Sequence, residues 1–207
     1  AMDADGDFVV TWQSYDQDAA LSYGIYAQRY SKAGVPQGVE FRANTFTTND
    51  QRAPAIAIDA DGDFVITWHS YAQDGSGFGI YARRYSAAGV PGGNEFLVNT
   101  RTTDWQTASD VAMDADGDFV VTWQSYDQDG SYYGVYGRRY SNVGTPQTSE
   151  IALNTFTTLD QVSPAAAVDA DGNLIVAWRS FGHVGAGSGI YADRLASTSP
   201  RLSGPTV

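Results

Sequence analysis

The sequence predicts an all-β fold built from four copies of one antiparallel unit, and three observations support this. The segment AMDADGDFVVTWQSYDQD occupies positions 1–18 and recurs letter for letter at positions 112–129, with related segments beginning at Ala57 and Ala167. Apolar and polar residues alternate with a period of two through these segments, which is the pattern of half-buried strands. The chain holds 22 Gly, and aromatic residues make up 13% of it, a composition typical of turn-rich β proteins.

The repeats indicate one repeat domain over residues 1–207. The first aspartate of the shared DADG motif stands at positions 3, 59, 114 and 169, so the period is about 55 residues. The corresponding repeats are 1–56, 57–111, 112–166 and 167–207, and the first and last of them are incomplete. A regular period of this length is typical of units that stack on their neighbours.

Each repeat is expected to form four short strands, A to D. In the second repeat these are Pro54–Asp59, Asp63–Tyr71, Gly79–Ser86 and Glu95–Asn99. Between strands A and B, Asp59 can accept backbone N–H groups that follow it, and Gly62 supplies the positive φ of a tight turn. In the hairpin of strands C and D we expect Arg84 to pair across the strands with Glu95.

Four antiparallel strands per repeat fit the blade of a β-propeller, in which successive sheets pack face to face. The alternating apolar residues on both faces of strand B agree with such packing. The fold class is therefore an all-β, propeller-like array of four four-stranded blades. The sequence leaves open whether these blades close into a four-bladed ring or form part of a larger or multi-chain propeller.

Charge and composition limit the classes of partner. The formal net charge is −12 and Lys32 is the single lysine, so neither nucleic-acid binding nor binding to an anionic membrane is expected. No apolar run approaches the roughly 18 residues that span a bilayer, so membrane insertion is not expected. With no cysteine, a disulfide framework or a thiolate site is impossible. Glycans or other copies of the chain remain as partners.

The motifs resemble those of known repeats. DADGDFVVTWQSYDQDGS, followed by GIYARRYS and NTFTT, resembles tandem repeats of very large bacterial surface proteins, which often lie beside haemolysin-type calcium-binding segments. The stretch Val168–Trp178 is similar to NHL-type propeller blades, and its Asp, Gly and Trp spacing resembles the Asp-box of sialidases. This resemblance implies a propeller blade in a secreted or surface-displayed bacterial protein.

The DADGD turns raise a calcium hypothesis, because closely spaced carboxylates supply the hard oxygen ligands that Ca²⁺ prefers. From Asp59, however, glycine falls at the fourth position rather than the sixth, and Ser70 stands where a bidentate glutamate is required, so the turn is not an EF-hand. The alternative is a turn whose aspartates cap backbone amides. The candidate calcium ligands are Asp3, Asp5, Asp7, Asp59, Asp61, Asp63, Asp114, Asp116, Asp118, Asp169 and Asp171.

A second candidate site is the end of the array that carries the B–C and D–A loops. Aromatic rings beside carboxylates can stack on sugars and bind their hydroxyl groups, whereas the alternative is a solvated loop surface whose Gln51, Gln106 and Gln161 hold the D–A loops. The candidate ligand-binding residues are Tyr15, Asp16, Asp18, Asp74, Trp105, Tyr126, Asp127, Asp129, Tyr132 and Tyr133. Trp105 is the residue that the alternative explains least.

No enzyme is expected from the sequence, because catalytic residues should break the symmetry of the repeats and few positions do so. The repeated Trp12, Trp68, Trp123 and Trp178 are expected in the core. The expected function is a non-catalytic extracellular module for adhesion, scaffolding or assembly. A multivalent carbohydrate-binding propeller is the main alternative, and an Asp-box-type glycan hydrolase is a further one.

Overall fold

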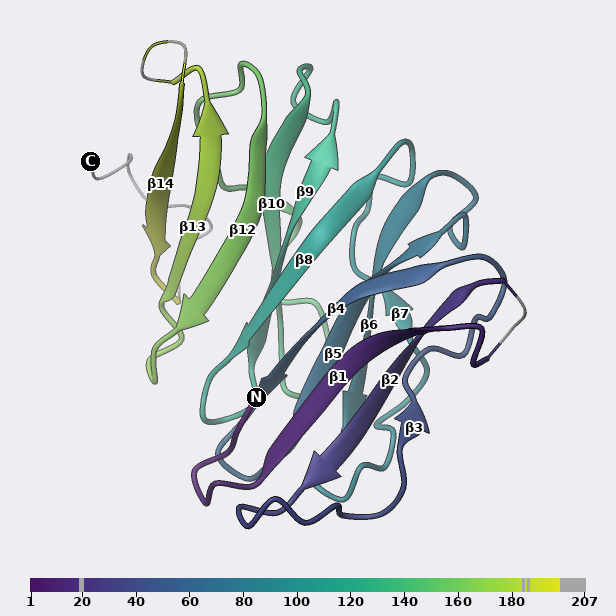
Figure 1. Ribbon diagram of the computed structural model, residues 1–207. Coiled ribbons are helices and arrows are strands. Elements are labelled where there is room, and N and C mark those ends of the chain that lie inside the picture. The colour runs from purple at the N-terminus through teal and green to yellow at the C-terminus, as the bar shows by residue number, and fades with distance from the viewer. Residues whose placement is uncertain (19–20, 184, 186, 198–207) are drawn as a thin grey trace.

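The computed structural model describes residues 1–18, 21–183, 185 and 187–197, and this part of the chain is made of strands joined by turns and loops. Figure 1 shows the strands side by side in a twisted array. Its fourteen strands are β1 Phe8–Tyr15, β2 Tyr23–Tyr30, β3 Phe41–Arg42, β4 Gln51–Ile58, β5 Phe64–Tyr71, β6 Phe78–Tyr85, β7 Phe96–Leu97, β8 Gln106–Met113, β9 Phe119–Tyr126, β10 Tyr133–Tyr140, β11 Ile151–Ala152, β12 Gln161–Val168, β13 Leu174–Phe181 and β14 Ser188–Leu195.

The strands form four separate antiparallel sheets, which confirms the predicted propeller-like array. Blade 2 (β4–β7) and blade 3 (β8–β11) have the four expected strands, whereas blade 1 (β1–β3) and blade 4 (β12–β14) have three. Blade 1 lacks a full strand A, which is represented by a bridge between Met2 and Phe8. The last repeat is predicted to be incomplete, and its residues beyond strand C fall mainly at 198–207, outside the described residues. Within the described part no helix is long and apolar enough to cross a membrane.

Turn chemistry explains the A–B hairpins. The Asp59 carboxylate accepts the backbone N–H groups of Asp61 (3.0 Å) and Asp63 (2.9 Å) through one oxygen, Oδ1. Gly62 has φ 88°, a conformation that glycine adopts without steric cost. The predicted roles of Asp59 and Gly62 are therefore confirmed.

The core lies between the blades rather than within any one sheet. Val9 and Ile25 of blade 1 pack against Phe64 and Trp68 of blade 2, and the next two boundaries repeat this arrangement. Trp68, Trp123 and Trp178 are buried, as expected for core residues, whereas Trp12 of blade 1 is partly exposed. Each blade is thus stabilised mainly by the apolar surface that its neighbours cover.

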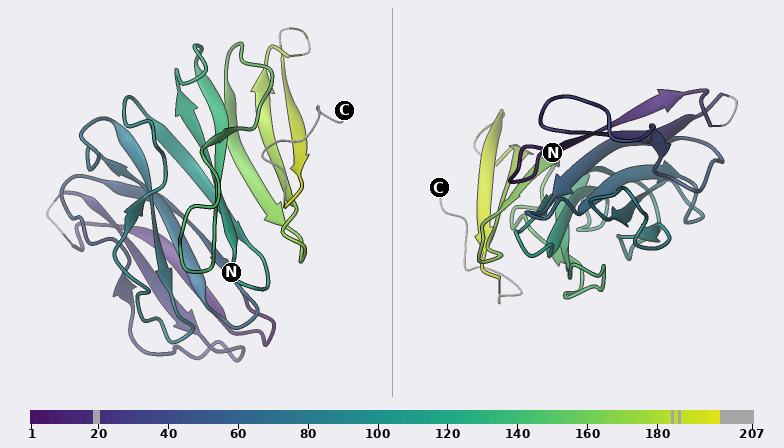
Figure 2. Two further views of the ribbon diagram at one scale, coloured as in Figure 1. Left: turned by 180° about the vertical axis from the view of Figure 1, so that it is seen from behind. Right: turned by 90° about the horizontal axis from the view of Figure 1, so that it is seen from below.

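Within the described residues, the four blades do not close into a ring. Seen from below, successive sheets are turned relative to one another along an arc, with β14 at one end (Figure 2). Val10 at one end of the array and Ile175 at the other are exposed, although their counterparts at inner boundaries are buried. Of the two arrangements that the sequence left open, the closed four-bladed ring is therefore wrong.

The expected pairing of Arg84 with Glu95 is also wrong. Strands β6 and β7 pair Ala82 with Phe96, which does not place Arg84 opposite Glu95. The Glu95 carboxylate instead accepts the backbone N–H groups of Thr45 and Phe46 in blade 1, the second at 3.2 Å. Glu95 therefore joins neighbouring blades. Leaving a loop amide without an acceptor costs more free energy than a surface ion pair contributes.

Candidate functional site

The B–C and D–A loops lie at the same end of each blade, as the strand order predicts. The backbone N–H of Tyr126, at the end of β9, donates to the carbonyl of Trp105, just before β8 (2.9 Å). Tyr71 makes the same bond to Asp50 in blade 2 (2.9 Å). We call this end the loop face.

Two polar residues fix most D–A loops. Gln51, Gln106 and Gln161 are fully buried, and the Gln51 amide donates to the carbonyl of Thr48 (3.1 Å). The residue before the glutamine is aspartate in blades 2 and 4, and its carboxylate accepts a backbone N–H of the preceding blade. Asp50 accepts the N–H of Tyr23 at 3.1 Å, and Asp160 accepts that of Tyr133 at 3.3 Å. The loop-holding role of the glutamines is therefore confirmed.

Trp105 stands in blade 3 where blades 2 and 4 have this capping aspartate. An indole ring accepts no such bond, so the cap seen at Tyr23 and Tyr133 is replaced by a ring contact. Trp105 meets Phe78 of blade 2 edge to face, with ring centres 6.0 Å apart. A Cβ at Gly77 would lie 2.3 Å from the indole, so the chain requires glycine there. Half of Trp105 (51%) is nevertheless exposed to solvent.

A hollow of about 290 Å³ opens beside the indole, lined by Asp104, Trp105, Tyr126 and Tyr133. The two tyrosine rings meet at 70° with their centres 5.2 Å apart. Asp104 forms an ion pair with Arg101 at 3.1 Å. Burial, and secondarily the charge of Asp160, raises the pKa of Tyr133, so its hydroxyl stays protonated at neutral pH. The hollow therefore offers three aromatic rings, a hydroxyl donor and a carboxylate acceptor.

Other candidate residues lie elsewhere on the loop face. Tyr15 is exposed and leans on Tyr23 (4.9 Å), and Tyr132 is exposed at the tip of the blade 3 loop. Asp16 and Asp127 have positive φ (63° and 55°) where their B–C loops begin. None of these four residues lines the hollow beside Trp105.

Asp18, Asp74 and Asp129 have an internal role that the sequence pattern did not reveal. The Asp18 carboxylate accepts the side-chain amide of Asn44 at 3.0 Å, and Asp129 accepts that of Asn154 at 3.4 Å. Each carboxylate covers the glycine that follows the first residue of strand C. Burial raises the pKa of Asp74. We therefore assign these aspartates to loop structure rather than to the ligand. The covered glycines are Gly24, Gly79 and Gly134.

The DADGD turns lie at the opposite end of the blades, and their carboxylates bind backbone amides. Asp114 Oδ1 accepts the N–H groups of Asp116 (3.1 Å) and Asp118 (3.0 Å), as Asp59 does in its own turn. Asp118 in turn accepts the N–H of Asn142 in the C–D turn (2.8 Å). Among the described residues, no three acidic, imidazole or thiol side chains gather to hold a metal ion. The calcium hypothesis stays a prediction.

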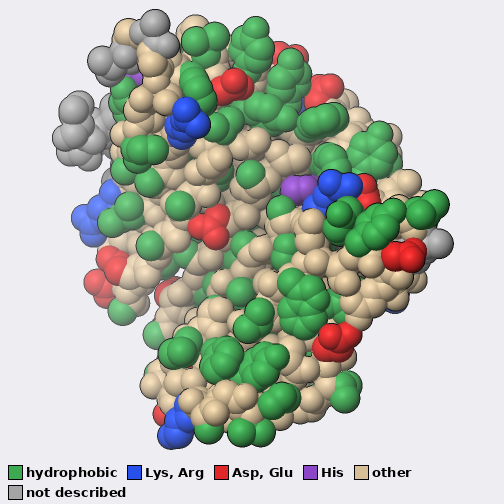
Figure 3. All heavy atoms as spheres, viewed as in Figure 1, with side chains coloured by type: hydrophobic (Ala, Val, Ile, Leu, Met, Phe, Trp, Pro, Cys, Tyr) green, Lys and Arg blue, Asp and Glu red, His purple; other side chains and the backbone are tan. Residues whose placement is uncertain are grey.

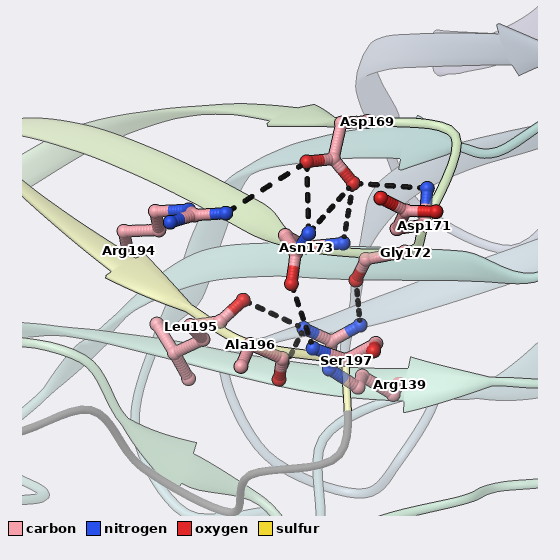
Figure 4. Close-up of polar contacts among 9 residues, drawn as sticks. All are labelled: Arg139, Asp169, Asp171, Gly172, Asn173, Arg194, Leu195, Ala196 and Ser197. Carbon is pink, nitrogen blue, oxygen red and sulfur yellow. Dashed lines mark hydrogen bonds and ion pairs between the residues drawn. The ribbon is translucent and has the colours of Figure 1, made fainter.

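Hollows of about 340, 280 and 260 Å³ separate successive DADGD turns. Each is lined by the carboxylates of one turn, an aspartate of the next turn and one arginine of strand C. At the last boundary that arginine is Arg139, which donates to the carbonyls of Gly172 (2.7 Å), Leu195 (3.3 Å) and Ala196 (3.4 Å) in blade 4 (Figure 4). The arginine is therefore a clamp between blades.

Comparison with known proteins bears on the fold. No family model and no curated protein matches the sequence. An endo-arabinase from Bacteroides thetaiotaomicron matches with a TM-score of 0.54 at 15% identity, over 89% of this chain and 70% of that one. A protein of unknown function from Dyadobacter fermentans matches with a TM-score of 0.63 at 13% identity, over 94% and 51%. A sucrose-6-phosphate hydrolase from Lactobacillus gasseri gives 0.53 at 11%, over 86% and 40%. This chain therefore spans about half of the Dyadobacter protein and 40% of the Lactobacillus hydrolase.

The expectation that the chain is not an enzyme is wrong, because it shares its fold with an arabinase and a hydrolase. Two departures from the repeat pattern lie in or beside one strand. Trp105 directly precedes β8, and β8 carries Asp110, whereas the residues that correspond to Asp110 on β4 and β12 are Ala55 and Ala165. Aligning the repeats on their buried glutamines would have revealed Asp110 from the sequence. The chain thus shares its propeller fold with an endo-arabinase and a sucrose-6-phosphate hydrolase.

Proposed function

We propose that the chain is a carbohydrate-binding propeller module whose ligand occupies the hollow beside Trp105. The observation that carries the proposal is the grouping of Trp105, Tyr126 and Tyr133 around one open hollow of about 290 Å³. Aromatic rings pack against the C–H faces of a sugar, while the Asp104 carboxylate can accept its hydroxyl groups. A half-exposed tryptophan has an unfavourable contact with water that such a ligand would relieve.

The comparison with the other blades supports a binding role for Trp105. An aspartate at its position caps a backbone amide of the neighbouring blade, as Asp50 and Asp160 do. Trp105 gives up this stabilising bond and leaves a large apolar surface exposed. Because the indole does not recur at Asp50 or Asp160, we propose one such site per chain rather than the repeated site of a multivalent lectin.

The class of ligand has support from proteins with a similar fold, which include an endo-arabinase and a sucrose-6-phosphate hydrolase. Both names refer to carbohydrates. The resemblance of the DADGDFVVTW repeats to bacterial surface proteins suggests the setting. We propose a secreted or surface-displayed protein in which this module holds a glycan, and such binding would serve adhesion.

The test replaces Trp105 with aspartate, the residue at the corresponding position in blades 2 and 4. Trp105→Asp should keep the fold, because it restores the capping residue, and should weaken glycan binding at least tenfold. A glycan array followed by calorimetry on the best ligand measures this effect. Tyr15→Ala, on the same face but outside the hollow, is the matched control and should bind as the unmodified chain does. Unchanged affinity in Trp105→Asp, or no binding to any glycan, would contradict the proposal.

Cleavage of the bound glycan is a second candidate function. It is favoured by Asp110, the single acidic residue on the three strands A, which are β4, β8 and β12. One carboxylate oxygen of Asp110 accepts a hydrogen bond from the backbone N–H of Ala166 (2.8 Å). Glycoside hydrolysis needs carboxyl groups at the scissile bond. If Asp110 takes part, Asp110→Asn should abolish the release of reducing ends while glycan binding remains. Asp116→Asn, in an exposed turn, is the control. Equal release by the unmodified chain and Asp110→Asn, or none by either, would exclude this role.

A further inference from the structure

The two faces of a blade differ in chemistry. We call the face that points toward the next blade in the chain its forward face, and the opposite face its rear face. The forward faces present one residue of strand B and one of strand C, and these pairs are buried at all three inner boundaries. The pairs are Val9 and Ile25, Val65 and Ile80, and Val120 and Val135.

The rear faces of blades 2 and 3 are aromatic. Each presents a phenylalanine that opens strand B, stacked on the tyrosine that ends strand C. Phe64 and Tyr85 lie 4.9 Å apart with their planes at 10°, and Phe119 and Tyr140 repeat this at 5.0 Å and 9°. All four rings are buried under the preceding blade. At each of the three inner boundaries, the forward face of one blade packs against the rear face of the next.

Both ends of the array present one of these faces uncovered. At the forward face of blade 4, Ile175 is 52% and Ile190 75% exposed, although they correspond to the buried pairs of the other blades. At the rear face of blade 1, Val10 is 44% exposed, whereas its counterpart Ile66 is fully buried. In the space-filling view, hydrophobic side chains lie open over β1 at the lower end of the array (Figure 3).

The rear face of blade 1 already has the geometry of a buried interface. Phe8 and Tyr30 are stacked 5.1 Å apart with their planes at 11°, as their counterparts are at the covered boundaries. Both rings remain partly exposed. A partner blade would therefore meet an arrangement that needs little reorganisation, which reduces the entropic cost of binding.

A polar contact is also ready at the other end. Arg139 of blade 3 clamps blade 4 by donating to three of its carbonyls, and Arg194 holds the corresponding position in blade 4. Figure 4 shows both arginines: among the described residues the Arg194 side chain reaches only Asp169, at 4.0 Å, and this side chain is 61% exposed. At the first boundary Arg29 donates to the carbonyl of Ala88 (2.7 Å), so Arg194 would have a matching acceptor at Ala33 of a following blade 1.

We propose that the forward face of blade 4 binds the rear face of blade 1 in a second copy of this chain. The contact continues the interface that the chain repeats at three inner boundaries, with Ile175 and Ile190 covered by Phe8, Val10 and Tyr30 of the second copy. Because the two faces differ, the contact is head to tail. Such contacts build closed rings when the rotation returns to its start, and filaments otherwise.

Sedimentation velocity over a range of concentrations tests the proposal. The unmodified chain should form dimers or larger species as its concentration rises, whereas Val10→Arg and Ile190→Asp should each remain monomeric. Both side chains are already exposed, so the variants should fold, which circular dichroism checks. Val90→Asp, at a C–D turn valine whose exposure (61%) lies between those of Val10 and Ile190, is the matched control and should associate as the unmodified chain does.

Mixing the two variants identifies which faces meet. Val10→Arg keeps an intact blade 4 face and Ile190→Asp keeps an intact blade 1 face, so an equimolar mixture should form one-to-one dimers that grow no further. Association through two like faces would instead survive in one of the variants alone. A chain that stays monomeric at all concentrations, or an association that Val10→Arg leaves intact, overturns the proposal.

Discussion

The sixth residue of strand B contacts the following blade and differs among the repeats. Gln13 accepts the backbone N–H of Ala53 through its side-chain oxygen (2.8 Å), and Gln124 accepts that of Ser163 (2.9 Å). Blade 2 has His69 at this position, and its buried Nδ1 has no hydrogen-bond partner. Burial, together with the charge of Arg52, lowers the pKa of His69 to about 4. The histidine is therefore neutral in the folded protein at mildly acidic pH.

We predict that His69→Gln reduces the loss of stability between pH 6.5 and pH 4. In that window His69 is protonated in the unfolded chain but stays neutral in the folded chain. The free energy of unfolding therefore falls as pH decreases. The shift from 6.5 to about 4 corresponds to about 3 kcal/mol at most. Urea unfolding of both proteins at pH 7 and pH 4.5 measures the difference. If both proteins lose the same free energy of unfolding, His69 does not carry this dependence.

The DADGD turns supply a second prediction at the scale of the residue. Asp114→Ala should lower the free energy of unfolding by about 1–2 kcal/mol, because two backbone amides lose their acceptor. Asp114→Asn keeps an accepting oxygen and should cost much less. Melting curves of the unmodified chain with added calcium and with a chelator test the calcium hypothesis, which an unchanged melting temperature would contradict. A calcium-dependent rise that Asp114→Asn abolishes would show that the turn binds the ion.

Among the elements, the short strand β7 of blade 2 links blades through the residue that precedes it, Glu95. Glu95 accepts two backbone amides of blade 1 and the side-chain amide of Gln73 (2.7 Å). We predict that Glu95→Ala costs about 2–3 kcal/mol, whereas Arg84→Ala in the same hairpin costs less than about 1 kcal/mol. Thermal and urea unfolding of both variants and of the double variant check this. A large coupling energy between the two positions would restore the cross-strand pair that the sequence suggests.

Repetition and alternation were sufficient to predict strands B and C to within one residue, since both are long and two-sided. Strand A was placed too late, at Pro54 rather than Gln51, because a register shift separates Arg52 from Ala55. The shift puts Ala53 at φ 49°, a conformation that alanine disfavours and that sequence preference does not indicate. The tertiary contact with Gln13 offsets this local cost.

The candidate site was predicted less well than the fold. Trp105 could be identified because it departs from a repeat, and its neighbours Tyr126 and Tyr133 were chosen as exposed aromatics on the same face. Asp18 and Asp129 were chosen as carboxylates beside aromatic residues in the B–C loops. Their structural role depends on Asn44 and Asn154, which are 26 and 25 residues away in the chain. Such a contact becomes visible only when the sheet is assembled.

The whole molecule is a linear array in which each blade depends on its neighbours for burial. In such arrays stability is close to a sum of unit and boundary contributions, so the end units open most easily. Blades 2 and 3 have two covered faces, whereas blades 1 and 4 have one each. The chain contains its own control for this difference, because β1 and β9 have the identical sequence FVVTWQSY.

We predict that the backbone amides of β9 exchange with solvent far more slowly than those of β1. Identical sequences give nearly equal intrinsic exchange rates, so the ratio of measured rates reports the environment of each strand alone. Strand β9 lies between β8 and β10 under two neighbouring blades, whereas β1 pairs fully only with β2. Hydrogen exchange followed by NMR distinguishes the two copies. Equal protection would show that the array unfolds as one unit, and a rise in β1 protection with concentration, absent at β9, would report the covering of blade 1 by a second copy.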